Sequence, residues 1–222
     1  MTTIILDTET TGVKDAEVVE LAWAEIKTVA PFLWHREAAE TRRFQNEKPM
    51  QWGALATHHI LPTDLLGCPP SSEARMPECT YLIGHNIDFD WKMLGSPPVK
   101  RICTMALARF AYPDCDSHSQ SALMYYIFGA RQGTKDLLRN AHSAEADILN
   151  CYALLLELIT KLNIKSIEEL YSVSEAARIP TVMPFGKHKG ALISTIDEGY
   201  KNWYRRQAET DPYILMAFSK KK

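Results

Sequence analysis

The hydrophobic pattern of this chain is built from short apolar runs that end on polar residues. Residues 3–6 are apolar and β-branched and are followed by Asp7, which is typical of a short buried strand. Residues 17–27 alternate well enough between apolar and polar positions to predict a second strand. Three shorter runs predict further strands, and these are Glu40–Gln45, Tyr81–Gly84 and Arg101–Thr104.

Helical spacing occurs between and after these strands. Residues 143–162 give the clearest pattern, because Ala146, Leu149, Ala153, Leu156 and Ile159 form one apolar stripe. Strands that alternate with helices predict an α/β fold with a mixed sheet. Shorter helices are predicted at Met50–His58, Pro62–Leu66, Phe89–Leu94, Met105–Ala111 and Ser121–Phe128.

The character of the chain changes after residue 162. Residues 163–180 are polar and predict a linker with one helix, and residues 181–222 predict a small second module. This last segment has eight Lys and Arg against four acids, a net charge of +4, which leaves −6 for the rest of the chain. An acidic body joined to a basic segment suits phosphate chemistry with electrostatic help from the tail.

Composition excludes several other classes of protein. The five cysteines are scattered without a C-x-x-C spacing, so we expect reduced thiols of a cytoplasmic protein, with neither a zinc ribbon nor a disulfide framework. No apolar run approaches the roughly 20 residues of a membrane span. Residues 1–7 lack the basic region and cleavage site of a signal peptide.

Three separated groups of acids indicate the chemistry. Asp7 and Glu9 lie two apart at the end of a predicted strand, so both side chains face the same way. Asp88 and Asp90 enter a helix after another strand, and only one of them is needed as a metal ligand. His142 and Asp147 lie at the start of the long helix, in the segment His142-Ser-Ala-Glu-Ala-Asp147. Together these groups offer four carboxylates and a histidine.

Carboxylates crowded in this way predict a site for hard divalent cations. Mg²⁺ prefers oxygen ligands and completes its coordination with water and substrate phosphate. Two such ions about 4 Å apart stabilise both the attacking and the leaving oxygen of a displacement at phosphorus. The residues therefore predict a metal-dependent phosphodiesterase.

The motifs resemble those of the DEDDh, or DnaQ-like, 3′→5′ exonucleases. The segments Asp7-Thr-Glu-Thr-Thr-Gly12, His85-Asn-Ile-Asp-Phe-Asp90 and His142-Ser-Ala-Glu-Ala-Asp147 are similar to the three motifs of that family in order and separation. The likeness covers residues 1 to about 160 and implies an RNase H-like fold with a mixed five-stranded sheet. It also selects Asp90 over Asp88, because the last residue of the second motif is the family's catalytic acid.

The resemblance implies a mechanism and its residues. Asp7, Glu9, Asp90 and Asp147 would hold two Mg²⁺ or Mn²⁺ ions, and His142 would take a proton from the attacking water. The products would be a 5′-mononucleotide and a strand with a new 3′-OH. The same resemblance places four residues near the nucleic acid: Thr10, Gly12, His58 and Asn86.

Residues 181–222 narrow the resemblance to one type of exonuclease within this family. Met183-Pro-Phe-Gly-Lys-His-Lys-Gly190, followed by Trp203 and Tyr204, is similar to the small C-terminal module of the exodeoxyribonuclease X type, which acts on DNA. We expect Lys187 and Lys189 to contact phosphates. We expect Trp203 to pack inside the module, because so small a unit must bury its aromatic side chains to fold.

Two alternatives stay open at this stage. One is an RNA-trimming exoribonuclease of the ribonuclease T or oligoribonuclease type, against which the basic tail argues. The other is a nucleic-acid-binding or polymerase-associated proofreading subunit, whose tail would be a protein-docking element. Strand preference and oligomeric state are not predicted.

Overall fold

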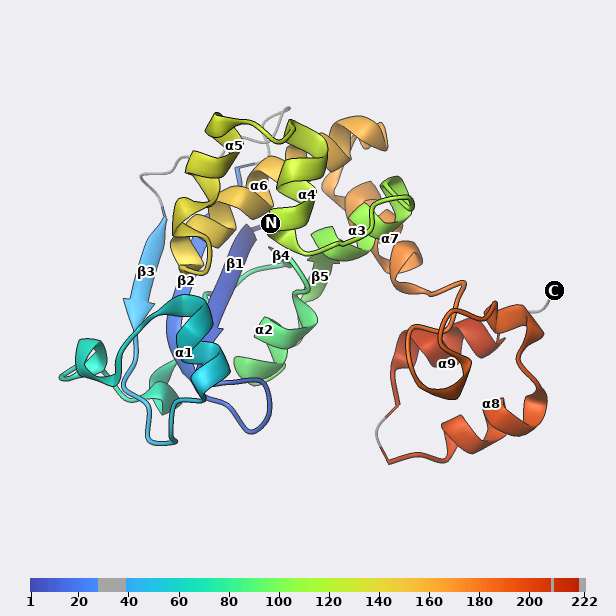
Figure 1. The fold of residues 1–222 in the computed structure, drawn as a ribbon, viewed down its shortest axis with the longest axis horizontal. Coiled ribbons are helices and arrows are strands. Elements are labelled where there is room, and N and C mark those ends of the chain that lie inside the picture. Colours follow the sequence, from blue (N-terminus) through green and yellow to red (C-terminus); the bar gives the residue numbers. More distant parts are fainter. Residues whose placement is uncertain (28–38, 209, 220–222) are drawn as a thin grey trace.

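A five-stranded sheet forms the centre of the computed structural model, which describes residues 1–27, 39–208 and 210–219 (Figure 1). The strand order is β3-β2-β1-β4-β5. β1 pairs antiparallel with β2 and parallel with β4, so the sheet is mixed, as predicted. The strands are β1 (Thr3–Thr10), β2 (Val18–Glu25), β3 (Glu40–Arg43), β4 (Tyr81–Gly84) and β5 (Lys100–Cys103).

Helices connect the strands and cover both faces of the sheet. Most of the predicted helices are present with small changes at their ends, and α5 is an addition that the apolar pattern did not indicate. The helices are α1 (Trp52–His58), α2 (Asp88–Met93), α3 (Thr104–Ala111), α4 (Gln120–Phe128), α5 (Gln132–Leu137), α6 (Ala144–Lys161), α7 (Ile167–Arg178), α8 (Glu198–Arg205) and α9 (Pro212–Ser219). Short 3₁₀ turns are Pro62–Leu65, Ser71–Glu73, Leu138–Asn140, Gly186–His188 and Ile193–Thr195.

Strand β1 separates the two layers of the core. Ile5 packs in the layer that contains the buried side chains of α6, whereas Ile4 and Leu6 pack in the layer that contains Ile87 of the segment leading into α2. Successive side chains of a strand point to opposite faces. Asp7 therefore continues the row of Ile5, on the α6 side of the sheet.

Helix α6 buries a different stripe from the one predicted. The side chains of residues 146, 149, 153, 156 and 159 are only partly buried, whereas Ile148, Leu155 and Leu158 are fully buried. Bulky aliphatic side chains remove more apolar surface from water than the alanines of the predicted stripe. The helix itself was predicted correctly, and the error was in which of two adjacent stripes faces the sheet.

Helix α7 packs on the central layers. This helix lies in the segment 163–180, which was expected to be a linker. Leu170 is fully buried in the same core layer as α6, and the Ser174 hydroxyl accepts a hydrogen bond of 2.9 Å from the Cys103 amide at the end of β5. The polar surface of α7 hid this role, because only one stripe of the helix is apolar.

Residues 181–219 contain a small core of their own. Met183, Ile193, Tyr204, Ile214 and Phe218 are buried together there, and the segment lies beside the sheet at the right of Figure 1. The prediction that Trp203 fills this core was wrong, because its side chain is 53% exposed. Its neighbour Tyr204 packs on Phe218 in its place, and the Tyr204 hydroxyl accepts a hydrogen bond from the Asp211 amide.

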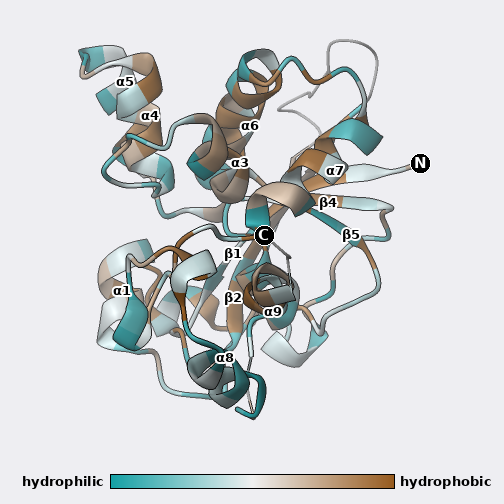
Figure 2. Cartoon of the chain, turned by 90° about the vertical axis from the view of Figure 1, so that its right-hand side faces the viewer, coloured by the Kyte–Doolittle hydropathy of each residue, from teal (hydrophilic) through white to brown (hydrophobic). Residues whose placement is uncertain are grey.

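The buried core consists mainly of apolar side chains. Brown, apolar segments lie along the strands and the inner faces of the helices in Figure 2. All five cysteines are free thiols. Within the described ranges, none of the helices combines the length and the apolar character that a membrane span requires.

Candidate active site

Strand β1 holds two of the predicted carboxylates. We expected the strand to end at Leu6, but its pairing with β2 continues to Thr10, with Asp7 opposite Ala22 and Glu9 opposite Glu20. Asp7 and Glu9 are two residues apart in a regular strand, so their side chains point to the same face. The extension places both carboxylates on a strand that pairs with β2.

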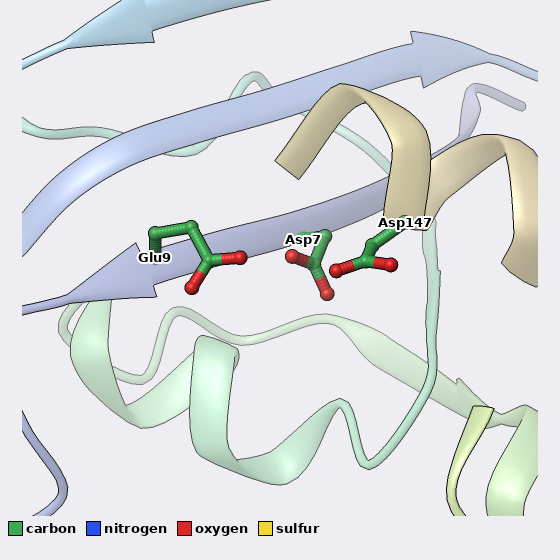
Figure 3. Close-up of side chains that lie close together, drawn as sticks. All are labelled: Asp7, Glu9 and Asp147. Atoms are coloured by element: carbon green, nitrogen blue, oxygen red, sulfur yellow. The ribbon is translucent and has the colours of Figure 1, made fainter. Parts of the chain in front are cut away.

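Helix α6 brings the third carboxylate to this face. Its first turn is capped by Ser143, whose hydroxyl accepts from the Ala146 amide. Asp147 lies in that first turn, and its side chain points toward β1 (Figure 3). One oxygen from each of Asp7, Glu9 and Asp147 lies within 4.8 Å of the other two. We call these three residues the carboxylate cluster.

Burial and crowding make negative charge unfavourable in the carboxylate cluster. Burial raises the pKa of Asp7 well above its ordinary value, and its acidic neighbours raise it further. Burial and the neighbouring carboxylates likewise raise the pKa of Glu9 to about 8. Burial raises the pKa of Asp147 to about 6, although the His142 ring and hydrogen bonds act in the opposite direction. None of the three forms an ion pair with a described Lys or Arg side chain.

Asp90 lies beside the cluster on α2. It is 4% exposed, and its Oδ1 accepts hydrogen bonds from the Thr8 amide at 3.0 Å and the Thr8 hydroxyl at 2.6 Å. Burial raises the pKa of Asp90 to about 7, against the effect of these bonds. Its charge in turn raises the pKa of Asp7. Asp90 is therefore held next to β1, outside the set of oxygens that lie within 4.8 Å of one another.

The other acid of the same segment has a structural role. Arg178 donates from Nη1 to both carboxylate oxygens of Asp88 at 2.8 Å, and Arg101 also pairs with Asp88. The Tyr213 hydroxyl accepts from Arg178 at 2.9 Å and donates to Glu175 at 3.0 Å. Asp88 thus ties α2 to α7 and to the C-terminal residues. The two acids of this segment therefore have different partners: Thr8 binds Asp90, and two arginines bind Asp88.

His142 is placed by the backbone. Its φ is 69°, in the left-handed region that non-glycine residues rarely adopt. Its amide donates a hydrogen bond of 3.0 Å to Oδ2 of Asp147, which holds this conformation. His142 is exposed to solvent, and its charge lowers the pKa of Asp147. The structure thus brings His142 to the cluster, just before the cap residue of α6.

A cavity of about 320 Å³ opens beside Glu9. Thr10, Gly12 and His58 line it, together with Val13 and Phe89. A Cβ at Gly12 would lie 2.1 Å from Cδ of Gln51, so a larger residue there requires the end of the Gln51 side chain to move. Three of the predicted nucleic-acid-binding residues therefore share one pocket next to the carboxylate cluster.

His58 has no free ring nitrogen in this pocket. Nδ1 accepts from the Ile60 amide at 3.0 Å, so Nε2 carries the proton and donates to the Thr10 carbonyl at 3.2 Å. Burial lowers the pKa of His58, in agreement with a neutral ring. Any contact of His58 with a ligand would be made through the ring surface.

The remaining predicted contacts lie outside the pocket. Asn86 is exposed, with a φ of 63°, in the turn before α2. Lys187 and Lys189 are exposed in the C-terminal segment. The structure does not place any of these three among the residues that line the cavity.

Sequence reasoning missed two residues that support the cluster. Glu20 is 3% exposed; its Oε1 accepts from the Ala144 amide at 3.0 Å and its Oε2 from Arg43 Nε at 2.8 Å. It thereby fixes the start of α6 to β2. Gln120 donates to the carbonyl and to Oδ1 of Asp147 at 2.9 and 3.1 Å. A lone acid within the apolar run of β2 was the signal for Glu20, whereas nothing in the sequence marked Gln120.

We expect Glu20→Ala to lower kcat roughly tenfold and to destabilise the fold by about 1–2 kcal/mol, because the buried Ala144 amide loses its acceptor. Glu20→Gln keeps an oxygen for that amide and should recover most of kcat. Steady-state kinetics and thermal melting of both variants test this role. Equal losses of kcat in the two variants would contradict a positioning role through Ala144.

Comparison with known proteins gives sequence and fold relatives. No family model matches the chain. Exodeoxyribonuclease 10 of Escherichia coli strain K12 is 27% identical over 210 residues, which cover 90% of this chain and 88% of the relative. The same protein of E. coli O6:H1 strain CFT073 matches to the same extent.

Solved structures share the fold. Exonuclease X in complex with 5′-overhanging duplex DNA has a TM-score of 0.58 and 21% identity, covering 78% of this chain and 99% of that one. The zinc-ion-bound form of an E. coli ExoI–ssDNA complex has a TM-score of 0.55 and 16% identity, covering 78% of this chain and 42% of that one. The RNase H-like fold and the resemblance to the DEDDh exonucleases are confirmed by these similarities.

Proposed function

Because the chain is similar in sequence and fold to the DEDDh, or DnaQ-like, exonucleases, we propose that it is a metal-dependent nuclease that shortens DNA from the 3′ end. The observation that carries the proposal is the carboxylate cluster. Burial and acidic neighbours raise the pKa values of Asp7 and Glu9, and burial raises that of Asp147, so a cation among the three carboxylates would favour their ionised forms. The similarity to exodeoxyribonuclease 10 supports DNA as the substrate.

The residues present fit a site for Mg²⁺ or Mn²⁺. Asp7, Glu9 and Asp147 offer hard oxygen ligands without a competing Lys or Arg among the described ion pairs. Asp90 keeps Oδ2 for the same site, since Oδ1 is bound by Thr8. Two ions held by these four residues would polarise the phosphodiester and lower the pKa of the attacking water. Glu20 and Gln120 keep Asp147 in place for this task.

His142 is the proton acceptor of the proposal. Its position just before the cap residue of α6 puts it next to Asp147, and as an exposed residue it can pass the proton on to solvent. The pocket lined by Thr10, Gly12 and His58 receives the terminal nucleotide, because it lies beside Glu9 and is open to solvent. Attack of water on the last phosphodiester then releases a 5′-mononucleotide and leaves a new 3′-OH.

We expect His142→Gln to lower kcat roughly 100-fold, near the lower end of the range for loss of a general base, since the metal supplies part of the activation of water. The substrate affinity should change little. The pH dependence of kcat distinguishes this role from a structural one, because the acidic limb that reports the base should be lost in the variant. A variant with the wild-type pH profile would exclude His142 as the base.

The polarity and substrate of the reaction are tested with strands of one sequence, prepared as DNA and as RNA and labelled at either end. We expect a ladder from 5′-labelled DNA and immediate release of the label as a mononucleotide from 3′-labelled DNA. Mass spectrometry should identify 5′-phosphates. A ladder on RNA alone would assign the protein to the RNA-trimming branch, and release of mononucleotides from the 5′ end would overturn the proposed polarity.

A further inference from the structure

The C-terminal module has an aromatic surface that the proposed active site does not use. Trp203 is 53% exposed and Phe185 is 47% exposed. Trp203 lies on α8, which Figure 1 shows within the module to the right of the sheet. Large exposed aromatic side chains grouped together mark a binding surface more often than isolated ones do.

The exposed Trp203 continues a row of rings. The His188 ring meets Tyr200 edge-on at 4.4 Å between centroids, and Tyr200 meets Trp203 at 5.2 Å with the rings inclined by 39°. We call His188, Tyr200 and Trp203 the aromatic row. Tyr200 and His188 are partly buried and support the exposed ring of Trp203. A supported ring loses little side-chain freedom when a base stacks on it.

Two lysines are the sequence neighbours of His188 in the aromatic row. Lys187 and Lys189 stand on either side of His188 in a turn whose φ values are positive at Gly186 and Gly190. The Lys189 amide donates to the Gly186 carbonyl at 3.1 Å, and the Gly190 amide donates to the Met183 carbonyl at 2.8 Å. The turn is therefore fixed onto the small core, with both lysine side chains exposed.

The charges of these lysines are free for a partner. Neither Lys187 nor Lys189 takes part in an ion pair with any described residue, whereas Lys201 and Arg205 of α8 are both paired with Glu198. An exposed ring, joined through the aromatic row to a turn with two unpaired lysines, matches a single nucleic-acid strand, whose bases stack and whose phosphates are anionic. The apolar face of a protein partner would not call for these cations.

We propose that the aromatic row, with Lys187 and Lys189, is a second binding site for single-stranded DNA, separate from the pocket beside Glu9. The inference takes its DNA substrate from the proposed function. A base stacks on Trp203, and the two lysines bind neighbouring phosphates. The module thereby holds a stretch of strand outside the active site and keeps the substrate on the enzyme.

The first test is binding of a fluorescent oligothymidylate of roughly 20 nucleotides to the full chain in EDTA, where no cleavage occurs. Trp203→Ala should weaken binding roughly 5- to 100-fold, the effect of removing one stacked base from its aromatic platform. Phe110→Ala is the matched control, because Phe110 is an exposed aromatic residue of α3, 62% accessible. Affinity unchanged in Trp203→Ala, or reduced equally in the control, would overturn the proposal.

The lysines are tested by salt dependence. In Lys187→Gln/Lys189→Gln the slope of log affinity against log salt should fall by about 0.7 for each phosphate that the variant no longer neutralises. Lys92→Gln/Lys165→Gln removes the same charge from exposed positions elsewhere and should leave the slope unchanged. Identical slopes in the two double variants would contradict phosphate binding by Lys187 and Lys189. Circular dichroism melting verifies that each variant is folded.

Digestion separates this inference from the proposed function. Trp203→Ala should raise KM for the long strand while kcat, and all kinetics on a trinucleotide that occupies the active site alone, stay at wild-type values. If wild-type protein digests DNA and Trp203→Ala has an unchanged KM and affinity, the second site is refuted and the proposed function stands. Wild-type protein that binds the oligothymidylate through Trp203 but digests nothing would refute the proposed function alone.

Discussion

Replacing Asp7 by Asn is expected to lower kcat on single-stranded DNA on the order of 10⁴-fold. Asp7 lies at the centre of the carboxylate cluster, where its oxygen is within 4.8 Å of those of Glu9 and Asp147. Loss of one ligand should release the cation and with it ~5.5 kcal/mol of transition-state stabilisation, the equivalent of that rate change. Single-turnover digestion at saturating Mg²⁺ measures the effect.

Asp114→Asn is the matched control for Asp7→Asn. Asp114 is an exposed acid between α3 and α4, so the same change of charge there should leave kcat unaltered. An Asp7→Asn protein that retains a tenth or more of the wild-type kcat would show that the cluster does not hold the catalytic cation.

The stability of Asp7→Asn should change in the opposite direction to its activity. Acids whose pKa is raised in the folded state bind more protons there than in the unfolded chain, so the stability of the metal-free protein falls as pH rises from about 4 to 8. The asparagine removes one of the repelling charges. Metal-free Asp7→Asn should therefore melt at a higher temperature than wild type at pH 8, and the difference should shrink toward pH 5.

Melting curves in EDTA across this pH range test the sign. Mg²⁺ should raise the melting temperature of wild type at pH 8 and have little effect on Asp7→Asn, because binding to the folded state alone stabilises it. A wild-type protein that becomes more stable between pH 5 and pH 8 in EDTA would contradict the repulsion among these carboxylates.

The second large effect is the contrast between Asp90→Asn and Asp88→Asn. Asparagine at 90 keeps an oxygen for the Thr8 amide and hydroxyl, so the fold should persist, while the loss of charge should reduce kcat on the order of 10³-fold. Asparagine at 88 removes the carboxylate that pairs with Arg101 and Arg178. It should retain most of kcat and destabilise the fold by about 1–2 kcal/mol, since Asp88 is partly exposed.

Steady-state kinetics and denaturant unfolding of the two variants give their kcat and their free energy of unfolding. Together these values distinguish a catalytic acid from a structural acid within one motif. The matched substitution makes each variant the control for the other. Equal losses of activity in Asp88→Asn and Asp90→Asn would contradict a structural role for Asp88 and a catalytic role for Asp90.

The sequence largely predicted which carboxylates lie close together in the fold. The i, i+2 spacing of Asp7 and Glu9 fixes their common face once they lie on a strand, and the resemblance chose Asp90 over Asp88. In the structure Asp88 is bound by two arginines, whereas Asp90 accepts hydrogen bonds from Thr8. The length of β1 was not readable, because the acids that extend it are poor strand formers by propensity and are kept in the strand by pairing with β2.

The residues that support the cluster and the core are held by contacts between distant parts of the chain, which local sequence patterns do not predict. Glu20 reaches Ala144 across 124 residues of sequence. Helix α7 looked like part of a linker, but its buried stripe fits the core beside α3 and β5. Trp203 and Tyr204 are adjacent aromatic residues, and only the packing against Phe218 decided that Tyr204 is the one inside.

The most direct test of the central claim is digestion of 5′-labelled single-stranded DNA by the wild-type protein in Mg²⁺ and in EDTA. We predict a ladder of fragments shortened one nucleotide at a time in Mg²⁺, and intact DNA in EDTA. Intact DNA in both, with the protein folded, or equal degradation in both, would contradict the assignment of a cation-dependent nuclease site to Asp7, Glu9, Asp90 and Asp147.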